Sequence, residues 1–247
     1  PNDSLFSLSL YKELPDFAFG RAFQAGKQRV GFGYTGTPDF EVFLEGDLPE
    51  SFASVVSLDR ETDTLYYWYK GIDADSLKFT LKHKNLTKSY EYRIRKAEPD
   101  SLKVTVLQSG TLNLADTLKI RTNTPLNGID IGAISLRDKD SIIIPYKLVQ
   151  NNKHEFQILF DVFPSESYQL QLLPGAITDF FDLTHDTLIV KLKTKSRVDY
   201  GNLSLRLGNI PSFPIFIDLL DEKEKIKRSE YITEPSGIFR FAYLRPS

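Results

Sequence analysis

The sequence predicts an all-β protein, built from antiparallel β-sandwiches in series. Apolar and polar residues alternate with a period of two, as at Leu77, Phe79 and Leu81, which is the spacing of a strand with one buried face. A tripeptide of Asp, Ser or Thr, and Leu or Ile recurs where such runs begin. It is typical of a strand start, because the polar side chains satisfy turn backbone groups and the branched residue enters the pleated surface. No stretch of a dozen residues shows the 3.6-residue period of a helix.

Composition narrows the class of protein. The 247 residues with 41% hydrophobic content suffice for packed cores, and no apolar run approaches the length of a membrane-spanning helix. The 31 basic and 33 acidic residues are interspersed, so no nucleic-acid partner is expected. Cysteine is absent, which excludes disulfides and thiolate metal sites. No cofactor is expected. The chain also lacks methionine and begins at Pro1, so we expect it to be a mature or excised fragment.

The first complete sandwich is expected over residues 27–110. Its strands are predicted at residues 30–34, 40–44, 65–69, 77–81, 90–94 and 102–106, with a helical turn at 50–54. Residues 1–26 contain one more alternating run, at Phe6, Leu8 and Leu10, and then a loop over residues 11–27. We therefore expect residues 1–26 to be a strand and linker from a preceding module, or a strand that pairs with an exposed edge.

A second sandwich is expected over residues 111–197. Its strands are predicted at residues 118–122, 129–136, 142–146, 156–160, 168–172 and 188–192. Turns are expected at residues 124–128 and 173–175, where Pro and Gly occur, and a single helical turn is expected in the loop over residues 178–183.

The remaining residues, 198–247, form a third block that is predicted to be incomplete. Strands are predicted at residues 203–207, 215–220 and 239–243. We expect roughly four strands in the whole block, whereas an immunoglobulin-like sandwich has about seven in ~100 residues. The open edge is therefore expected to pair with the strand at Phe6 to Leu10, with a neighbouring module or with a second molecule.

Several motifs in the second block resemble those of one family. The run Asp116-Thr117-Leu118 and the corner Pro174-Gly175-Ala176-Ile177-Thr178-Asp179 are similar to an SbsA-type bacterial Ig-like domain. The wider arrangement resembles the C-terminal part of an Ig-like-domain lipoprotein of Bacteroidetes, with a carboxypeptidase-regulatory-like β module over residues 198–247. The resemblance implies tandem Ig-like sandwiches, export, a lipid anchor upstream of this chain, and a place at the outer membrane, on its periplasmic face or at the cell surface. It implies no catalytic residues. The chain stops where the family continues with one more strand and an Asp- and Asn-rich loop.

An aromatic run supplies the candidate ligand-binding residues. In a strand that starts at Leu65, Tyr67 and Tyr69 share its face, and Tyr66 and Trp68 lie together on the other. If that face is solvated, Tyr66 and Trp68 can stack on a sugar or a partner strand. The alternative is that Trp68 is a buried core residue of the sandwich.

No set of residues indicates catalysis or a metal site. His83, His154 and His185 occur in different contexts without a second ligand at metal spacing, and no Gly-x-Ser-x-Gly elbow is present. Asp179, Asp182 and Asp186 can offer oxygens to calcium, but their spacing matches no calcium loop. The same residues serve equally well as caps of a turn or a strand. We expect no metal and no enzyme.

The recurring tripeptide also resembles the O-glycosylation motif of exported Bacteroidetes proteins, in which the hydroxyl carries the glycan. The candidate positions are Thr64, Ser76, Ser101, Thr117, Ser141 and Thr187.

The function expected from the sequence is that of a non-catalytic structural, spacing or protein-docking fragment of an envelope or surface lipoprotein. Its expected partners are other envelope proteins and glycan, with the membrane reached only through the upstream anchor. The alternative is a carbohydrate-binding accessory protein in polysaccharide capture.

Overall fold

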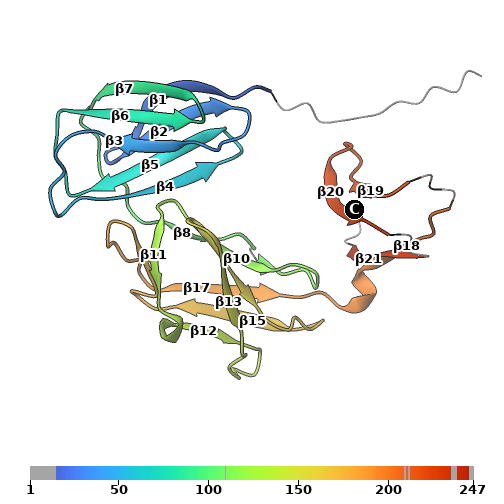
Figure 1. Cartoon of the computed structure of the whole chain (residues 1–247). Coiled ribbons are helices and arrows are strands. Elements are labelled where there is room, and N and C mark those ends of the chain that lie inside the picture. Colours follow the sequence, from blue (N-terminus) through green and yellow to red (C-terminus); the bar gives the residue numbers. More distant parts are fainter. Residues whose placement is uncertain (1–14, 109, 209, 211, 235–237, 245–247) are drawn as a thin grey trace, which may run out of the picture.

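Strands make up nearly all the regular structure of the protein. The computed structural model describes residues 15–108, 110–208, 210, 212–234 and 238–244, and arranges them in three successive β bodies (Figure 1). Besides strands, this part of the chain contains two short 3-10 helices, η1 (Ile131–Ala133) and η2 (Arg197–Asp199). The predicted all-β class is confirmed. None of the described helices is long and apolar enough to cross a membrane.

The first body is a sandwich of two antiparallel sheets. One has the order β1-β2-β5-β4 and the other β3-β6-β7. The strands are β1 (Ala18–Gly26), β2 (Arg29–Thr35), β3 (Glu41–Leu44), β4 (Ala53–Asp59), β5 (Thr64–Lys70), β6 (Ser76–His83) and β7 (Leu86–Arg93). Alternate residues of both sheets meet in one core, including Phe32, Tyr67 and Phe79, as strands with one buried face require.

Strands β1 and β4 differ from the expectations. β1 pairs with β2, so residues 18–26 belong to this sandwich, and the loop predicted over residues 11–27 is wrong for residues 18–26. Register shifts between Phe19 and Ala22 and between Gln24 and Gly26 interrupt the alternation of β1, which hid it in the sequence. Where a helical turn was expected at residues 50–54, the structure has one hydrogen-bonded turn, in which the Phe52 N–H donates to the Pro49 carbonyl at 2.9 Å, and β4 begins at Ala53. The strand expected at Phe6 to Leu10 lies outside the described residues.

The second body is another sandwich, with sheets in the orders β13-β14-β10-β8 and β12-β15-β17-β9 and a separate ribbon of β11 and β16. All its pairs are antiparallel except β9 with β17. The strands are β8 (Val104–Val106), β9 (Gly110–Thr111), β10 (Leu118–Thr122), β11 (Leu126–Ile129), β12 (Ile134–Arg137), β13 (Lys147–Asn152), β14 (Glu155–Leu159), β15 (Ser167–Leu172), β16 (Ile177–Asp179) and β17 (Leu188–Lys193). Because β8 pairs with β10, this body begins before residue 110, earlier than predicted.

Two strands predicted in the second body are not continuous. The segment expected at residues 129–136 is split by η1, where Asp130 accepts a hydrogen bond from the Gly132 N–H at 2.9 Å and turns the chain. The segment expected at residues 142–146 makes only an isolated bridge, from Ile143 to Arg137. The apolar run is thus exposed at Ile142 and Ile143 instead of buried. Strand β13, rich in polar residues, was not predicted.

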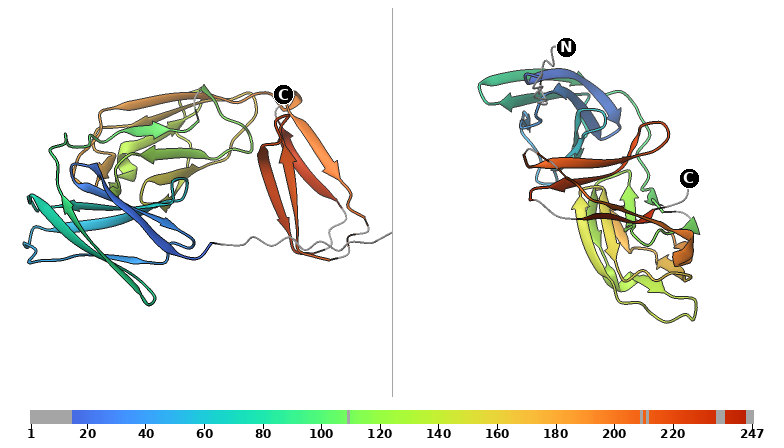
Figure 2. Two further views of the ribbon diagram at one scale, coloured as in Figure 1. Left: turned by 90° about the horizontal axis from the view of Figure 1, so that it is seen from above. Right: turned by 90° about the vertical axis from the view of Figure 1, so that its right-hand side faces the viewer.

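The third body consists of two two-stranded sheets, β18 with β21 and β19 with β20. The strands are β18 (Gly201–Leu205), β19 (Ile215–Leu220), β20 (Ile226–Ile232) and β21 (Phe239–Leu244). Their inner residues include Ile232 and Phe241, both buried. The first two bodies lie against each other in Figure 1 and in the left view of Figure 2, and their contact holds the candidate site.

Candidate functional site

The outer face of β5 is where the first sandwich meets the second. The register places Arg29 of β2 and Val55 of β4 on either side of Trp68, and directly opposed residues share a face of a sheet. Leu65, Tyr67 and Tyr69 point into the core of the first sandwich. Trp68 therefore lies on the face opposite that core, as the alternation predicts.

Trp68 is nevertheless only 1% exposed. Its indole contacts two rings of the second sandwich, with centroids 5.6 Å from His154 and 6.2 Å from Phe181. The indole Nε1–H donates to Ser57 Oγ at 2.8 Å, so its polar atom is satisfied. Trp68 is buried, as expected of a structural residue, but it is the second sandwich that buries it and not the packing between its own two sheets.

Arg29 lies at one side of the contact between the two sandwiches around Trp68, which we call the joint. Its guanidinium lies 4.6 Å from the Trp68 ring centroid and 5.4 Å from that of Tyr66, a cation–π geometry. The same group is 3.7 Å from Asp100 Oδ2, in the segment that connects the two sandwiches. A Cβ at Gly26 would lie 2.6 Å from that carboxylate oxygen, so glycine allows the connector to approach.

Lys70 and the loop after β16 close the other side. The Lys70 ammonium pairs with Asp182 and lies 5.2 Å from the Phe180 ring centroid. The loop is shaped by Asp179, whose buried Oδ1 accepts hydrogen bonds from the N–H groups of Phe181 at 2.9 Å and Leu183 at 2.8 Å. Asp179 thus holds the loop in the conformation in which Phe181 contacts Trp68 of the first sandwich.

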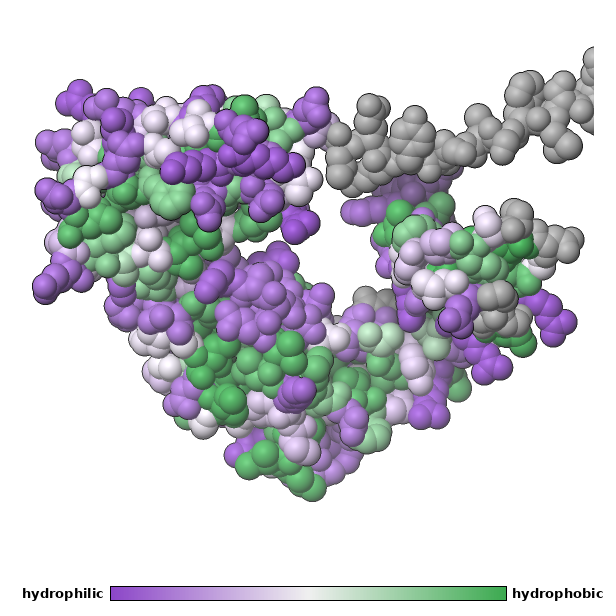
Figure 3. Space-filling model, in the orientation of Figure 1, coloured by the Kyte–Doolittle hydropathy of each residue, from purple (hydrophilic) through white to green (hydrophobic). Residues whose placement is uncertain are grey.

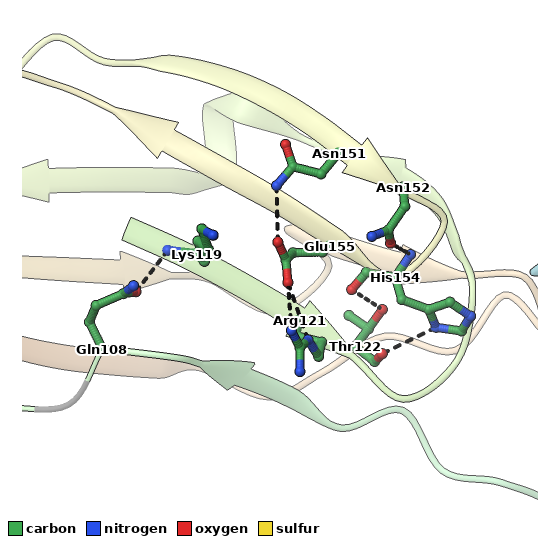
Figure 4. Close-up of polar contacts among 8 residues, drawn as sticks. All are labelled: Gln108, Lys119, Arg121, Thr122, Asn151, Asn152, His154 and Glu155. Atoms are coloured by element: carbon green, nitrogen blue, oxygen red, sulfur yellow. Dashed lines mark hydrogen bonds and ion pairs between the residues drawn. The ribbon is translucent and has the colours of Figure 1, made fainter. Parts of the chain in front are cut away.

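His154 occupies the turn between β13 and β14. Its ring Nδ1 lies 3.2 Å from the Thr122 carbonyl oxygen, and Asn152 Oδ1 accepts from its backbone N–H at 2.7 Å (Figure 4). Burial lowers the pKa of His154 below its ordinary value of 6.5, and the nearby charge of Arg29 lowers it further, against the opposing effect of the Thr122 carbonyl. Neutral imidazole is therefore favoured at the joint.

Glu155, the next residue, is used within the second sandwich. Its carboxylate accepts from Arg121 Nη2 at 2.9 Å and from Asn151 Nδ2 at 3.0 Å (Figure 4). Burial alone would raise its pKa, but these hydrogen bonds outweigh burial and hold the pKa below the usual range. Glu155 is therefore a paired structural carboxylate in β14.

The acidic loop and the other histidines have separate structural contacts. Asp179 caps the loop, Asp182 pairs with Lys70, and among the described residues no group of three or more His, Asp or Glu side chains is arranged to hold a metal ion. His83 stacks on Phe17 with centroids 3.7 Å apart. His185 contacts the Asp186 carbonyl through Nδ1.

The candidate glycosylation positions differ in accessibility. Thr64 is buried and its hydroxyl donates to the Thr62 carbonyl at 3.0 Å. The side chain of Thr117 is half-buried, and the exposed positions are Ser76, Ser101, Ser141 and Thr187. Modification of any of them stays a prediction, and the geometry favours it least at Thr64.

Sequence reasoning identified Trp68 but missed what surrounds it. Arg29 appears as one polar residue of a strand, and His154 carries no motif. The sequence feature that could have indicated this contact is the adjacent pair Phe180 and Phe181, which lies in a loop bounded by two aspartates. Large apolar residues in a loop are costly unless another element covers them.

Comparison with known proteins adds little to this geometry. No family model and no curated protein matches the chain. Among solved structures, it is similar to one described as "Anomalous substructure of Titin-A168169" (12% identity, 68% of this chain, 90% of that one, TM-score 0.26). It is also similar to "Structure of the S-layer protein SbsC, domains 5-6" (10% identity, 73% and 100% covered, TM-score 0.27) and to "Crystal structure of domains A168-A170 from titin" (11% identity, 93% and 88% covered, TM-score 0.25). Similarities this low carry no functional argument, so function is inferred from the joint.

Proposed function

We propose that this chain is a non-catalytic structural, spacing or protein-docking part of an exported envelope or surface lipoprotein. The observation that carries the proposal is the joint around Trp68, which fixes the first sandwich against the second. A spacer needs a defined reach and angle, and those depend on how successive modules are joined.

The joint has the properties of a built contact. Modules within one chain usually move relative to each other unless their interface is apolar and substantial. Here a fully buried indole, a cation over its face and an ion pair between Lys70 and Asp182 all act across or beside the same contact. Breaking it would expose the indole and remove the contacts of its ring with His154 and Phe181.

Residues 116–118 and 174–179 resemble an SbsA-type Ig-like domain, and export and anchoring are supported by the resemblance of the wider arrangement to an Ig-like-domain lipoprotein. The absence of cysteine is compatible with a bacterial envelope protein. Membrane attachment would depend on an upstream lipid anchor, so the chain itself would supply reach and docking surface. Its expected partners are other envelope proteins.

Distance measurement between the sandwiches tests the proposal. The chain has no native cysteine, so spin labels at Thr87→Cys and Lys191→Cys report only the distance between exposed positions of β7 and β17. We expect a narrow distance distribution that Trp68→Ala broadens and that Phe216→Ala, at an exposed residue of the third body, leaves unchanged. A broad distribution in the unmodified background would contradict a fixed joint.

Carbohydrate binding stays as the alternative prediction for Tyr66 and Trp68. The structure offers it little support at this pair, because Trp68 is covered by the second sandwich and Tyr66 lies half-buried beneath Arg29. A glycan array with the full chain tests it directly. Binding that Tyr66→Ala abolishes, with the distance distribution unchanged, would favour this alternative over spacing alone.

A further inference from the structure

The free edge of β4 differs from the other outer strands of the first sandwich. β4 is the last strand of the order β1-β2-β5-β4, and no described segment pairs with its far side. Its seven residues pair with β5 without a register shift, so the edge is regular from Ala53 to Asp59. A regular free edge is a template for another strand.

The backbone groups on that edge follow from the neighbouring pairs. The Tyr69 N–H donates to the Gln28 carbonyl at 3.0 Å, so the backbone groups of Tyr69 face β2 and point away from β4. Its opposite residue on β4 is Ser54, and residues of such a pair both direct their N–H and C=O groups outward. By alternation, the outward groups of β4 belong to Ser54, Val56 and Leu58.

Other edges of this sandwich are protected. On β1, the Tyr90 hydroxyl donates to the Gly20 carbonyl at 2.6 Å, and the Tyr92 hydroxyl accepts from the Gln24 N–H at 2.8 Å. β1 also contains two register shifts, and β3 has only four residues. The remaining outer strand, β7, is regular but contains the charged residues Lys88, Glu91 and Arg93, and charge on an edge strand opposes pairing. Short, covered or irregular edges resist pairing.

β4 has none of these protections. Its only charged residue is Asp59, at its end, and Val56 and Leu58 are 45% and 38% exposed. Figure 3 shows apolar surface along the side of the first body where β4 runs in Figure 1. An uncharged, regular edge of this kind is suited to strand addition.

We propose that β4 pairs edge to edge with β4 of a second copy of this chain, antiparallel and centred on Val56. A two-fold axis through Val56 places Ser54 opposite Leu58 of the partner subunit and Val56 opposite Val56 of the partner subunit. All outward N–H and C=O groups then exchange hydrogen bonds in pairs.

The side chains favour this register and this occupant. Asp59 comes opposite Ala53 of the partner subunit, so no like charges face each other. A two-fold pair needs no second kind of surface, because one edge supplies both halves. The four-stranded sheets of the two copies would then form one continuous sheet. This pairing goes beyond the spacing function, because it would join two copies of the chain side by side.

Sedimentation of the full chain over a concentration series tests this pairing. We expect the unmodified chain to shift from monomer toward dimer as concentration rises, and Val56→Lys to remain monomeric because the axis sets two ammonium groups opposite each other. Thr87→Lys is the matched control, since it adds the same charge on exposed β7 and should dimerise like the unmodified chain.

Amide hydrogen exchange gives a second measurement that needs no variant. Protection of the Ser54, Val56 and Leu58 N–H groups should rise with concentration, whereas N–H groups of β7 should not change. A strictly monomeric unmodified chain, or a dimer that Val56→Lys leaves intact, would overturn the proposal. Capture of a different protein through β4, without self-association, would also overturn it in favour of a heterologous partner.

Discussion

Replacing Trp68 with alanine tests the packing of the first sandwich on the second. Truncating a buried Phe or Trp costs about 3 to 5 kcal/mol of unfolding free energy. Trp68 is 1% exposed and donates to Ser57, and Trp68→Ala would leave that buried hydroxyl without its donor. It would also remove the ring beneath the Arg29 guanidinium, a contact of about 1 to 2 kcal/mol when desolvated.

These contributions overlap, so we expect a total loss of about 3 to 5 kcal/mol. In a domain of this size each kcal/mol corresponds to roughly 4 to 8 °C, which predicts a fall of the first unfolding midpoint by ten degrees or more. Part of the loss belongs to the joint, because the core around Phe32 and Phe79 is not touched. The transition of the first sandwich should therefore also separate from that of the second.

Differential scanning calorimetry of the full chain measures both effects. Trp68→Phe is the matched variant, since it retains an aromatic ring but removes the donor to Ser57, and it should lose less than Trp68→Ala. The chain has a single tryptophan, so its fluorescence reports this site alone and should be blue-shifted and shielded from iodide. An unchanged midpoint in Trp68→Ala, or a quenchable red-shifted emission, would refute the reasoning, because an indole on an uncovered outer face would behave in that way.

Three further predictions concern His154, Gly71 and the acidic loop. His154 has a pKa below 6.5 in the folded chain, so the unfolded chain takes up the proton first as pH falls. The free energy of unfolding should therefore be greatest above pH 6.5 and should decrease as pH drops below 6.5. Denaturant titrations at several pH values should show this decrease, and His154→Gln should make the decrease smaller. Gly71→Ala should destabilise by about 1 to 3 kcal/mol or more, since φ is +81° and the new Cβ would lie 2.1 Å from the Ser51 carbonyl oxygen. Gly175→Ala, at φ +82° with no atom within 4 Å, should cost clearly less in the same melts, and equal losses would argue against the clash. Chelator should leave the melting midpoint in place because Asp179 and Asp182 are engaged by backbone N–H groups and Lys70, and a calcium-dependent rise would contradict this.

The sequence predicted strands best where one face is buried and the other solvated. β6, β10 and β15 show clean alternation, and each was expected within one or two residues. β1 and β13 were missed because register shifts and polar composition obscure the period. A strand was predicted at residues 142–146 but does not form there. The apolar run suggested a strand, but an apolar run forms one only if a neighbouring strand is there to pair with it.

By itself, the sequence determined the fold class and the placement of Trp68 on the face opposite Tyr67. These properties depend on local periodicity, which a single strand already contains. Only the tertiary structure decided what covers that face. Arg29 reaches Trp68 from the neighbouring strand β2, but His154 and Phe181 reach it from the turn before β14 and the loop after β16. Contacts with such distant segments depend on how two finished sandwiches pack. No pattern within one segment records that packing.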